Sequence, residues 1–457
     1  MIGRADIDDR VRAWGLREDV VEKDYVLGWV LWGIGGDPLL GRTWIFKGGT
    51  CLKKCYIETY RFSEDLDFTV LEDGPVEPEA VLEAVERVLD RVNQESGIDF
   101  SVRPPACRIR PSRASAEGRL YYRGPRGTPG PARIKLDLTR DEVVARPPVL
   151  RAISHDYPDN LPEPAQARCY GFEEVFAEKL RAMGERSRPR DLYDIVNLFR
   201  RPDFRPHAAL VREILALKCS SKGIPVPSFE SIRTSPMFDE LEAEWANMLD
   251  HQLRALPDFE HFFAELPRVF EWLSGKESPE PMPLAEDDEL WTPPLTFWTS
   301  GLGNRLEPVR FAAVNRLLVD LGYQGRNRLI EPYSLRRSSE GHLLLHALRA
   351  ESGAHRSYRL DRIESARVTT QPFTPSYAIE FPESGAIPAL PSARRSTGGR
   401  RSARRRSRSS EARYIVECPL CEKRFRRKRP GTRLRRHKDP TGTWDCSARS
   451  GTLDYID

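Results

Sequence analysis

The chain has 457 residues, too many for one ordinary hydrophobic core, so its length predicts two to four domains. Hydrophobic residues make up 39% and charged residues 31%, a balance typical of a soluble globular protein and not of a membrane protein. No apolar run approaches the roughly 20 residues of a membrane-spanning helix. Because acidic residues come early and no signal-peptide core follows the first methionine, we expect a cytoplasmic protein without a membrane partner.

The net charge of +4 is unevenly distributed along the chain. Residues 394–457 contain 20 Lys and Arg against 7 Asp and Glu, a net charge of +13, which leaves −9 on residues 1–393. An acidic body with a strongly basic tail predicts a polyanionic partner bound by the tail. A solvated, disordered tail without a partner is the alternative.

The first 200 residues predict a small mixed sheet with helices, in an α+β fold. Apolar spacing and turn signals give these elements in chain order: a helical region over 1–35, strands over 43–46 and 66–70, a helix over 78–92 that begins at a proline, a strand over 133–138, and helices over 172–186 and 190–199.

The rest of the chain divides by composition. After a domain over 1–204 we expect a helical extension over 205–276, a proline-rich acidic linker over 277–294, a β domain over 295–388, a disordered basic linker over 389–413, and a small last unit over 414–457. Strands are predicted in the β domain over 328–333, 341–350, 357–360 and 364–369.

The chemistry is concentrated around two aspartates. Asp65 and Asp67 are two positions apart on a predicted strand, so their carboxylates point the same way and can hold one or two divalent cations, Mg²⁺ or Mn²⁺. The preceding Gly48-Gly49-Thr50 turn lets backbone N–H groups approach a phosphate. Asp137, on another strand, either completes the metal site, activates an attacking hydroxyl, or only lies near a strand end.

Each of these features alone is common and more often structural than functional. Their order along the chain is more specific. Residues 46–50 (Phe-Lys-Gly-Gly-Thr), 61–68 (Arg-Phe-Ser-Glu-Asp-Leu-Asp-Phe), 173–182 and 190–194, together with Arg186, resemble the AbiEii/AbiGii nucleotidyltransferase toxin family of the polymerase-β-like superfamily. The resemblance spans roughly residues 10–200.

The resemblance implies a site residue by residue. The implied nucleotide-binding residues are Lys47, Gly48, Gly49, Thr50, Arg61, Ser63 and Lys179; the implied metal ligands are Asp65 and Asp67; the implied catalytic residues are Asp65, Asp67, Asp137, Lys179 and Asp191, with Arg190 in support. A solvated helix lysine is the plain alternative for Lys179. For Asp191 it is an acid stabilised by a helix N-terminus.

Residues 328–335, 341–345, 356–363 and 372–373 are similar to WYL domains, which are small Sm-like β-barrels that sense ligands or nucleic acid. The Trp-Tyr-Leu triplet is replaced by leucines at 343–345. Arg356, Arg359 and Arg362 alternate with apolar residues, which predicts either a basic groove for a nucleotide or single strand, or ordinary exposed arginines.

The last unit has the spacing of a zinc module. Cys418 and Cys421 form a Cys-X-X-Cys turn, and His437 and Cys446 complete a Cys3His set for structural Zn²⁺; a free redox pair is the alternative. Phe425, Leu434 and Trp444 are the expected core of this unit, and the basic residues around it predict binding to nucleic-acid phosphates.

Two functions follow. The first is a toxin that transfers a nucleotide from an NTP to an RNA hydroxyl. The family resemblance implies the 3′ end of tRNA as acceptor, an antitoxin protein as partner, and a setting in phage defence. The second is a nucleic-acid-binding regulator of the WYL and zinc type, whose nucleotidyltransferase domain senses a nucleotide without transferring it.

Overall fold

The computed structural model describes residues 1–57, 61–111, 114–200, 206–276, 281–285, 287–293 and 301–381, and short stretches between 414 and 455. The chain divides into two compact units, Met1–Ser392 and Ala393–Asp457. Among the described residues, no helix combines the length and apolar character needed to cross a bilayer.

The first part of the larger unit is built on a mixed sheet of seven strands in the order β3-β4-β5-β2-β1-β7-β6. The strands are β1 (Trp44–Lys47), β2 (Asp65–Val70), β3 (Ala106–Ile109), β4 (Ser115–Tyr122), β5 (Ala132–Thr139), β6 (Val149–Ala152) and β7 (Gln166–Cys169). The predicted strands at 43–46, 66–70 and 133–138 are confirmed, whereas β3, β4, β6 and β7 were not predicted.

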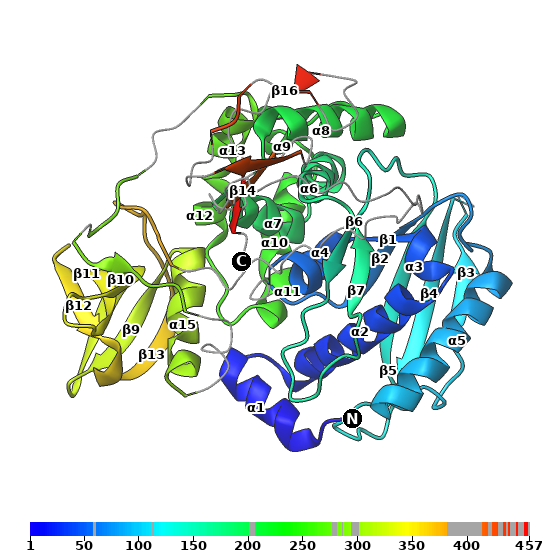
Figure 1. Cartoon of the computed structure of the whole chain (residues 1–457), viewed down its shortest axis with the longest axis horizontal. Coiled ribbons are helices and arrows are strands. Elements are labelled where there is room, and N and C mark those ends of the chain that lie inside the picture. The colour runs from blue at the N-terminus through cyan, green and yellow to red at the C-terminus, as the bar shows by residue number, and fades with distance from the viewer. Residues whose placement is uncertain are drawn as a thin grey trace, which may run out of the picture. The chain divides into compact units, whose positions relative to one another are not determined.

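Alternation explains how the central strands present polar groups. In β5, Ile134, Leu136 and Leu138 are fully buried, so the side chains between them face the other side of the sheet. The helices α2 (Glu18–Gly36) and α5 (Pro78–Ser96) pack against each other along the sheet (Figure 1). The sheet therefore has a covered apolar side and a polar side near the ends of β2 and β5.

The helical region predicted over 1–35 is two helices, α1 (Arg4–Trp14) and α2. Gly15 ends α1 in the left-handed conformation, with φ of 66°, and its N–H donates to the carbonyl of Val11. The short helix α3 (Leu40–Thr43) then leads into β1. After β1 the chain enters α4 (Gly48–Cys51), which continues as a π-helical turn, η1 (Leu52–Tyr56).

Helices follow the sheet, including in the region 205–276 that was predicted as a helical extension. The helices that follow the sheet are α6 (Phe172–Arg186), α7 (Pro189–Arg200), α8 (Ala208–Lys222), α9 (Phe229–Arg233), α10 (Phe238–Ala243), α11 (Trp245–Leu249), α12 (Phe259–Phe263) and α13 (Leu266–Leu273), with a 3₁₀ turn, η2 (Asp250–Gln252), after α11. They form the green cluster in Figure 1. Helix α7 packs on α6, α11, α12 and α13, which makes it the centre of this cluster.

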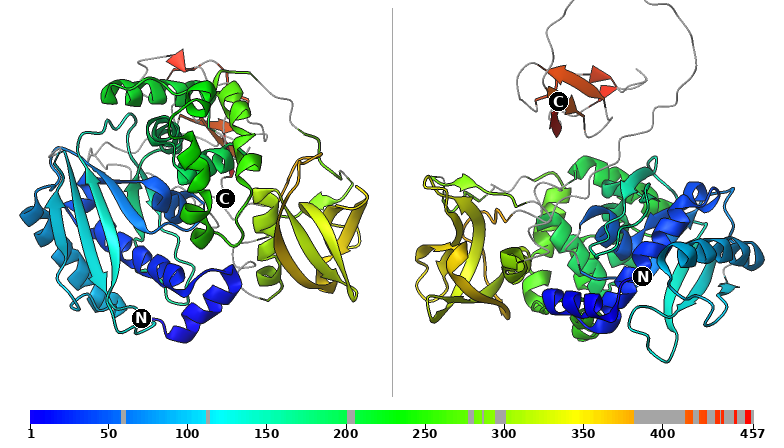
Figure 2. Two further views of the ribbon diagram at one scale, coloured as in Figure 1. Left: turned by 180° about the vertical axis from the view of Figure 1, so that it is seen from behind. Right: turned by 60° about the horizontal axis from the view of Figure 1, so that its bottom comes forward.

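A second sheet follows, with β8 (Glu289–Leu290), β9 (Leu317–Tyr323), β10 (Arg326–Arg337), β11 (Leu343–Arg349), β12 (His355–Arg359) and β13 (Ile363–Pro372), joined by the 3₁₀ turn η3 (Leu360–Arg362). Its path is β12-β11-β10-β9-β13, with β8 on β10. The expected closed barrel is wrong in that detail, because the paths of the described strands end at β12 and β13. Helix α15 (Gly301–Asn315), not predicted from the sequence, packs on β13, β9 and β10 and covers one face instead (Figure 2).

The smaller unit contains β14 (Tyr414–Glu417), β15 (Arg424–Arg427), β16 (His437–Lys438), β17 (Asp445–Cys446) and β18 (Thr452–Tyr455). The order β15-β14-β18 gives one sheet, and β16 pairs with β17 in another. Leu434 is buried, as expected for a core residue. Cys421 and Trp444 lie outside the described residues.

Candidate functional site

The predicted site residues of the first sheet converge on one cavity of about 430 Å³. It opens where the ends of β1, β2 and β5 meet α6 and α7. The predicted residues on its wall are Lys47, Gly48, Gly49, Arg61, Ser63, Asp65, Asp67, Asp137, Lys179, Arg190 and Asp191. They come from segments more than 100 residues apart in the sequence, so it is the fold that assembles them.

Three carboxylates stand together on the polar side of the sheet. Asp67 lies directly opposite Asp137 in the parallel pairing of β2 with β5, and Asp65 precedes Asp67 by two positions on the same face. Burial and, after it, the charge of Asp137 raise the pKa of Asp67 to about 6. Burial likewise raises the pKa of Asp65. Mutual repulsion in a half-buried place is what a divalent cation would relieve.

The glycine turn is shaped by this carboxylate cluster. Gly48 has φ of 81°, and a Cβ built on it would lie 2.3 Å from Oδ2 of Asp67. A Cβ on Gly49 would lie 2.8 Å from Nη2 of Arg61 and 3.0 Å from Oγ of Ser63. Both positions therefore need glycine, because a side chain would displace the groups that line the cavity.

Thr50 lies behind the cavity wall. Its side chain is fully buried, and its hydroxyl donates to the backbone carbonyl of Asp65 at 2.5 Å. The hydroxyl thus fixes the start of β2 against α4, and through it the position of the Asp65 backbone.

Lys179 is held by two buried aspartates. Its ammonium lies 3.1 Å from Oδ1 of Asp191 and 2.6 Å from Oδ2 of Asp194. Its side chain is 8% exposed, so the alternative of a solvated helix lysine is wrong. Asp191 also accepts from Nε of Arg186 at 2.9 Å. Burial alone would raise the pKa of Asp191, but the charges of Lys179 and Arg186 lower this pKa to about 2.

Asp194 was missed by the sequence analysis, although it follows Asp191 by three positions and therefore shares its helix face. It accepts two parallel bonds from Arg61, at 2.7 Å from Nε and 2.9 Å from Nη2. Asp191 is in the first turn of α7, so its stabilisation by the helix N-terminus holds alongside these ion pairs.

Arg190 carries a positive charge into the cavity. Within the described part of the chain, its Nε is buried and makes no hydrogen bond. Burial lowers the pKa of Arg190, and the neighbouring Arg61 lowers it further. A buried guanidinium with an unused donor fits an anionic ligand such as a phosphate.

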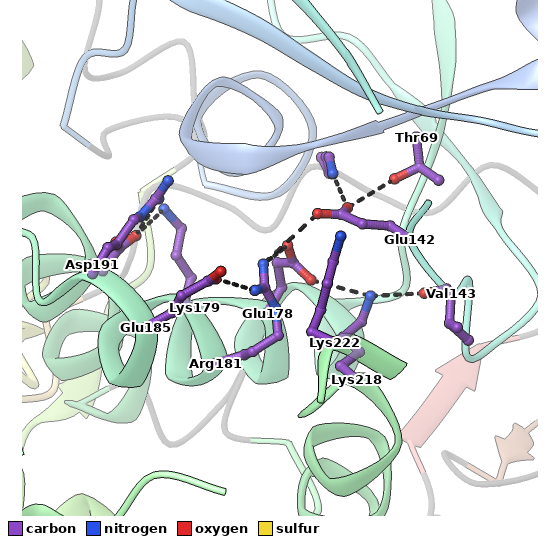
Figure 3. A network of polar contacts seen from close by, with 12 residues as sticks. Thr69, Glu142, Val143, Glu178, Lys179, Arg181, Glu185, Asp191, Lys218 and Lys222 are labelled. Atoms are coloured by element: carbon purple, nitrogen blue, oxygen red, sulfur yellow. Dashed lines mark hydrogen bonds and ion pairs between the residues drawn. The ribbon is translucent and has the colours of Figure 1, made fainter. Parts of the chain in front are cut away.

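The opposite wall is an ion-pair network that the sequence analysis also missed (Figure 3). Arg181 lies among Glu142, Glu178 and Glu185, with Glu178 at 2.9 Å. Glu142 also contacts the ammonium of Lys47. Burial alone would lower the pKa of Lys47, but Glu142 and other carboxylates raise it.

The same network fixes the loop after β5. Lys218 of α8 contacts Glu174 at 3.0 Å and Glu178 at 3.2 Å, and it donates to the carbonyl of Val143 at 3.0 Å. Glu174 and Glu178 are four positions apart on α6, a spacing that places both on one face and could have revealed them. Glu142 lies in a loop without such a pattern.

Arginines predicted in the β domain are on its surface. Arg356 and Arg362 are exposed, and Arg359 makes an ion pair with Asp361 at 2.8 Å. The strand β12, which carries Arg356 and Arg359, is an edge of the sheet. Both interpretations of these arginines, a basic groove or ordinary exposed residues, remain predictions.

In the smaller unit, three of the four predicted metal ligands come together. Ligand atoms of Cys418, His437 and Cys446 all lie within 4.8 Å of one another, and the two sulfurs are 3.5 Å apart. Nδ1 of His437 lies 2.8 Å from the carbonyl of Arg435, which leaves Nε2 as the nitrogen for a metal. These donors fit a thiophilic cation with tetrahedral N and S coordination.

Two family models match this chain. The family described as "Nucleotidyl transferase AbiEii toxin, Type IV TA system" matches residues 30–271, more than half of the chain, and the WYL domain family matches residues 304–368. A comparison with curated proteins finds no match. Among solved structures, the nucleotidyltransferase toxin MenT4 from Mycobacterium tuberculosis H37Rv is similar over 60% of this chain and 89% of its own, at 21% identity and a TM-score of 0.37.

The raised pKa of Asp67 predicts that this residue destabilises the protein when no cation is bound. Its pKa exceeds the unfolded value, so the associated stability is present at low pH and is lost as the pH rises through about 6. We expect Asp67→Asn to raise the free energy of unfolding at pH 7 by about 1–2 kcal/mol without added divalent cation. Denaturant unfolding measures this.

Added Mg²⁺ should stabilise the natural protein and leave Asp67→Asn unchanged. Asp141→Asn is the matched control, because Asp141 lines the same cavity but is half exposed and paired with Lys222 at 2.9 Å. Equal stabilisation of all three proteins by Mg²⁺ would contradict a cation site at the aspartates.

Proposed function

Since the chain belongs to the AbiEii nucleotidyltransferase toxin family and carries a WYL domain, we propose that it transfers a nucleotide from an NTP to an RNA hydroxyl. The observation that carries the proposal is the convergence of Asp65, Asp67 and Asp137 with Lys179 and the unused donor of Arg190 in one cavity. Carboxylates for a divalent cation and cations for phosphates are the two things that the reaction needs.

Each side chain has a part in this reaction. Asp65 and Asp67 would hold Mg²⁺ or Mn²⁺, which neutralises the triphosphate when bound. The Gly48-Gly49 turn lets the phosphates come close to the backbone, and Arg190 contacts their oxygens. The hydroxyl oxygen of the acceptor forms a bond to the α-phosphorus while the bond to the β-phosphate oxygen breaks, so pyrophosphate leaves.

Asp137 and Lys179 have supporting parts. Asp137 lies beside Asp67 and accepts from Lys135 at 2.5 Å, so it either joins the metal ligands or receives the proton of the acceptor hydroxyl. Lys179 is held by Asp191 and Asp194 with its ammonium at the cavity, where it contacts phosphate. Arg61 and Ser63 border the glycine turn and orient the nucleotide.

Label transfer tests the reaction. When the protein is incubated with total RNA and each α-labelled NTP, we expect one RNA class to become labelled, with the 3′ end of tRNA as the leading acceptor. Asp67→Asn should lower this transfer by at least about 10³-fold, because the cation then loses a ligand. Asp141→Asn should keep most of the activity.

The competing function is a nucleotide sensor without transfer. It predicts that the natural protein binds an NTP in the presence of Mg²⁺ but labels no RNA, and that toxicity in cells survives Asp67→Asn. Undiminished transfer by Asp67→Asn would contradict the assignment of the metal ligands instead.

The basic region is the proposed RNA-binding part. Residues 394–457 carry a net charge of +13, and Arg424, Arg433 and Arg435 are exposed there. Phosphate contacts by such residues release counterions and make binding depend on salt. The family description also supports a proposed antitoxin partner.

Salt dependence measures this contribution. We expect Arg433→Ala/Arg435→Ala to weaken RNA binding and to reduce the slope of log K against log salt by about 1–2. Arg17→Ala/Arg42→Ala, which removes two exposed arginines of the acidic body, is the control and should leave the slope unchanged. A slope that falls equally in both variants would contradict binding by the basic region.

We also propose that Cys418, Cys421, His437 and Cys446 hold a structural Zn²⁺. The support is the proximity of the three described ligands and the sequence position of Cys421. A unit of this size has little apolar core, so metal binding would supply most of its folding free energy.

Elemental analysis of the fragment 411–457 tests the zinc site. We expect one zinc per fragment, and a loss of the β-sheet circular dichroism when a chelator removes it. Cys418→Ser should abolish zinc binding, whereas Ser447→Ala should retain it. A folded fragment without metal would contradict the proposal.

A further inference from the structure

Three cysteines meet inside the first domain, away from the proposed catalytic aspartates. The Sγ atoms of Cys51, Cys55 and Cys169 all lie within 4.8 Å of one another, and all three residues are 0% exposed. They are free thiols. Neither the proposed transfer reaction nor the proposed zinc module uses them.

The backbone that carries these cysteines is unusual. Cys51 ends α4 and Cys55 lies one turn later in the π-helical η1, while Cys169 ends β7 opposite Phe46 of β1. π-helical turns are rare and are often found at functional sites. Here the turn is fixed from outside: Ser154 donates its N–H to the carbonyl of Lys54 at 2.7 Å, and Arg151 donates Nε to the carbonyl of Cys55 at 3.0 Å.

The surroundings of the cluster favour negative charge on sulfur. Burial alone would raise the pKa of Cys55. Hydrogen bonds from Cys169 and Cys51, together with the charge of Arg151, instead lower this pKa to about 5. Burial raises the pKa of the other two thiols. A thiolate is the form of cysteine that binds metals.

We propose that Cys51, Cys55 and Cys169 form a trithiolate site that binds one Cu⁺ ion. Sulfurs about 2.3 Å from a common ion lie about 4 Å apart in a trigonal arrangement, which fits the observed grouping. Soft thiolate ligands select Cu⁺ among the common cations. As the ion binds, each thiol that carries a proton releases it to solvent.

Coordination number favours Cu⁺ over Zn²⁺ here. The group contains three ligand residues in the described part of the chain, and its complete burial removes water as a ready fourth ligand. Zn²⁺ in structural sites is almost always four-coordinate. Cu⁺, with a filled d shell, accepts three sulfurs. Arg151 near Cys55 offsets part of the negative charge.

Metal binding at this place would affect the neighbouring cavity. Cys51 directly follows Gly48-Gly49-Thr50, and Cys169 pairs with the strand that leads into this turn. One ion would therefore link α4, the helix that follows β1 and contains the glycine turn, to β7, the strand that pairs with β1. The proposal does not rest on the proposed transfer reaction, because metal binding tests the site directly.

The experiment uses the full chain with Cys418→Ser/Cys421→Ser/Cys446→Ser, which removes the ligands of the smaller unit. This parent protein is loaded with Cu⁺ under anaerobic conditions against a bathocuproine chelator. We expect one Cu⁺ per chain and, by X-ray absorption, a first shell of three sulfurs. No retained copper, or a shell of two sulfurs, would overturn the proposal.

Additional substitutions assign the ion to the cluster. Cys55→Ala and, independently, Cys169→Ala should each reduce the retained copper from one per chain to less than 0.1 under conditions where the parent is saturated, a loss set by the missing third sulfur. Cys219→Ala is the matched control, since Cys219 is a buried cysteine of α8 outside the cluster. Circular dichroism before loading identifies any variant that fails to fold. Copper retained equally by folded Cys55→Ala would overturn the proposal.

Discussion

The cavity depends on one buried ion-pair cluster that joins the sheet to the helices. Arg61, just before β2, makes two parallel bonds to Asp194 of α7, and Lys179 of α6 contacts the same carboxylate. All three side chains are nearly excluded from solvent. Removing one member of such a cluster leaves an uncompensated buried charge, at a cost of about 3–5 kcal/mol. The cluster therefore fixes α6 and α7 at the distance from β2 that the cavity requires.

Charged side chains of both signs also line the cavity that this cluster holds open. Asp65, Asp67 and Asp137 repel one another on the sheet, and Lys179 is already engaged by aspartates. On the other wall, Lys47 and Arg181 are engaged by Glu142. Lys179, Lys47 and Arg181 are thus each engaged by carboxylates, whereas the buried Nε of Arg190 makes no hydrogen bond within the described residues.

Sequence patterns predicted the helices and strands that a few neighbouring residues determine. Alternation gave β2 and β5, and a proline gave the start of α5, because these signals lie within a few residues; α5 extends to Ser96, beyond the predicted end at residue 92. The edge strand β3 has half its residues exposed, and β6 and β7 are only four residues long. None of these three strands therefore shows a readable alternation of apolar and polar residues in the sequence. Helix α15 was missed because Pro308 lies inside it, where proline normally argues against a helix.

The site residues also fall into two groups: those in short sequence motifs and those brought into the site only by contacts distant in sequence. Asp65, Asp67 and Lys179 belong to motifs that are contiguous in sequence, and the structure brings them into one cavity. Glu142 and Lys218 have roles that depend on contacts 40 or more residues away, and no short-range signal encodes them. No sequence pattern joins the three buried cysteines, because β7 was not predicted and Cys169 therefore had no known neighbour.

The second sheet is connected to the proposed catalytic helix by polar contacts. The hydroxyl of Tyr193, next to Asp194 in α7, donates to Oδ1 of Asn315 at the end of α15 at 2.8 Å. Glu265 contacts both Arg200 of α7 and Arg316 after α15, at 2.5 and 2.6 Å. Helix α7 therefore carries Asp191 and Asp194 toward the cavity and Tyr193 and Arg200 toward α15.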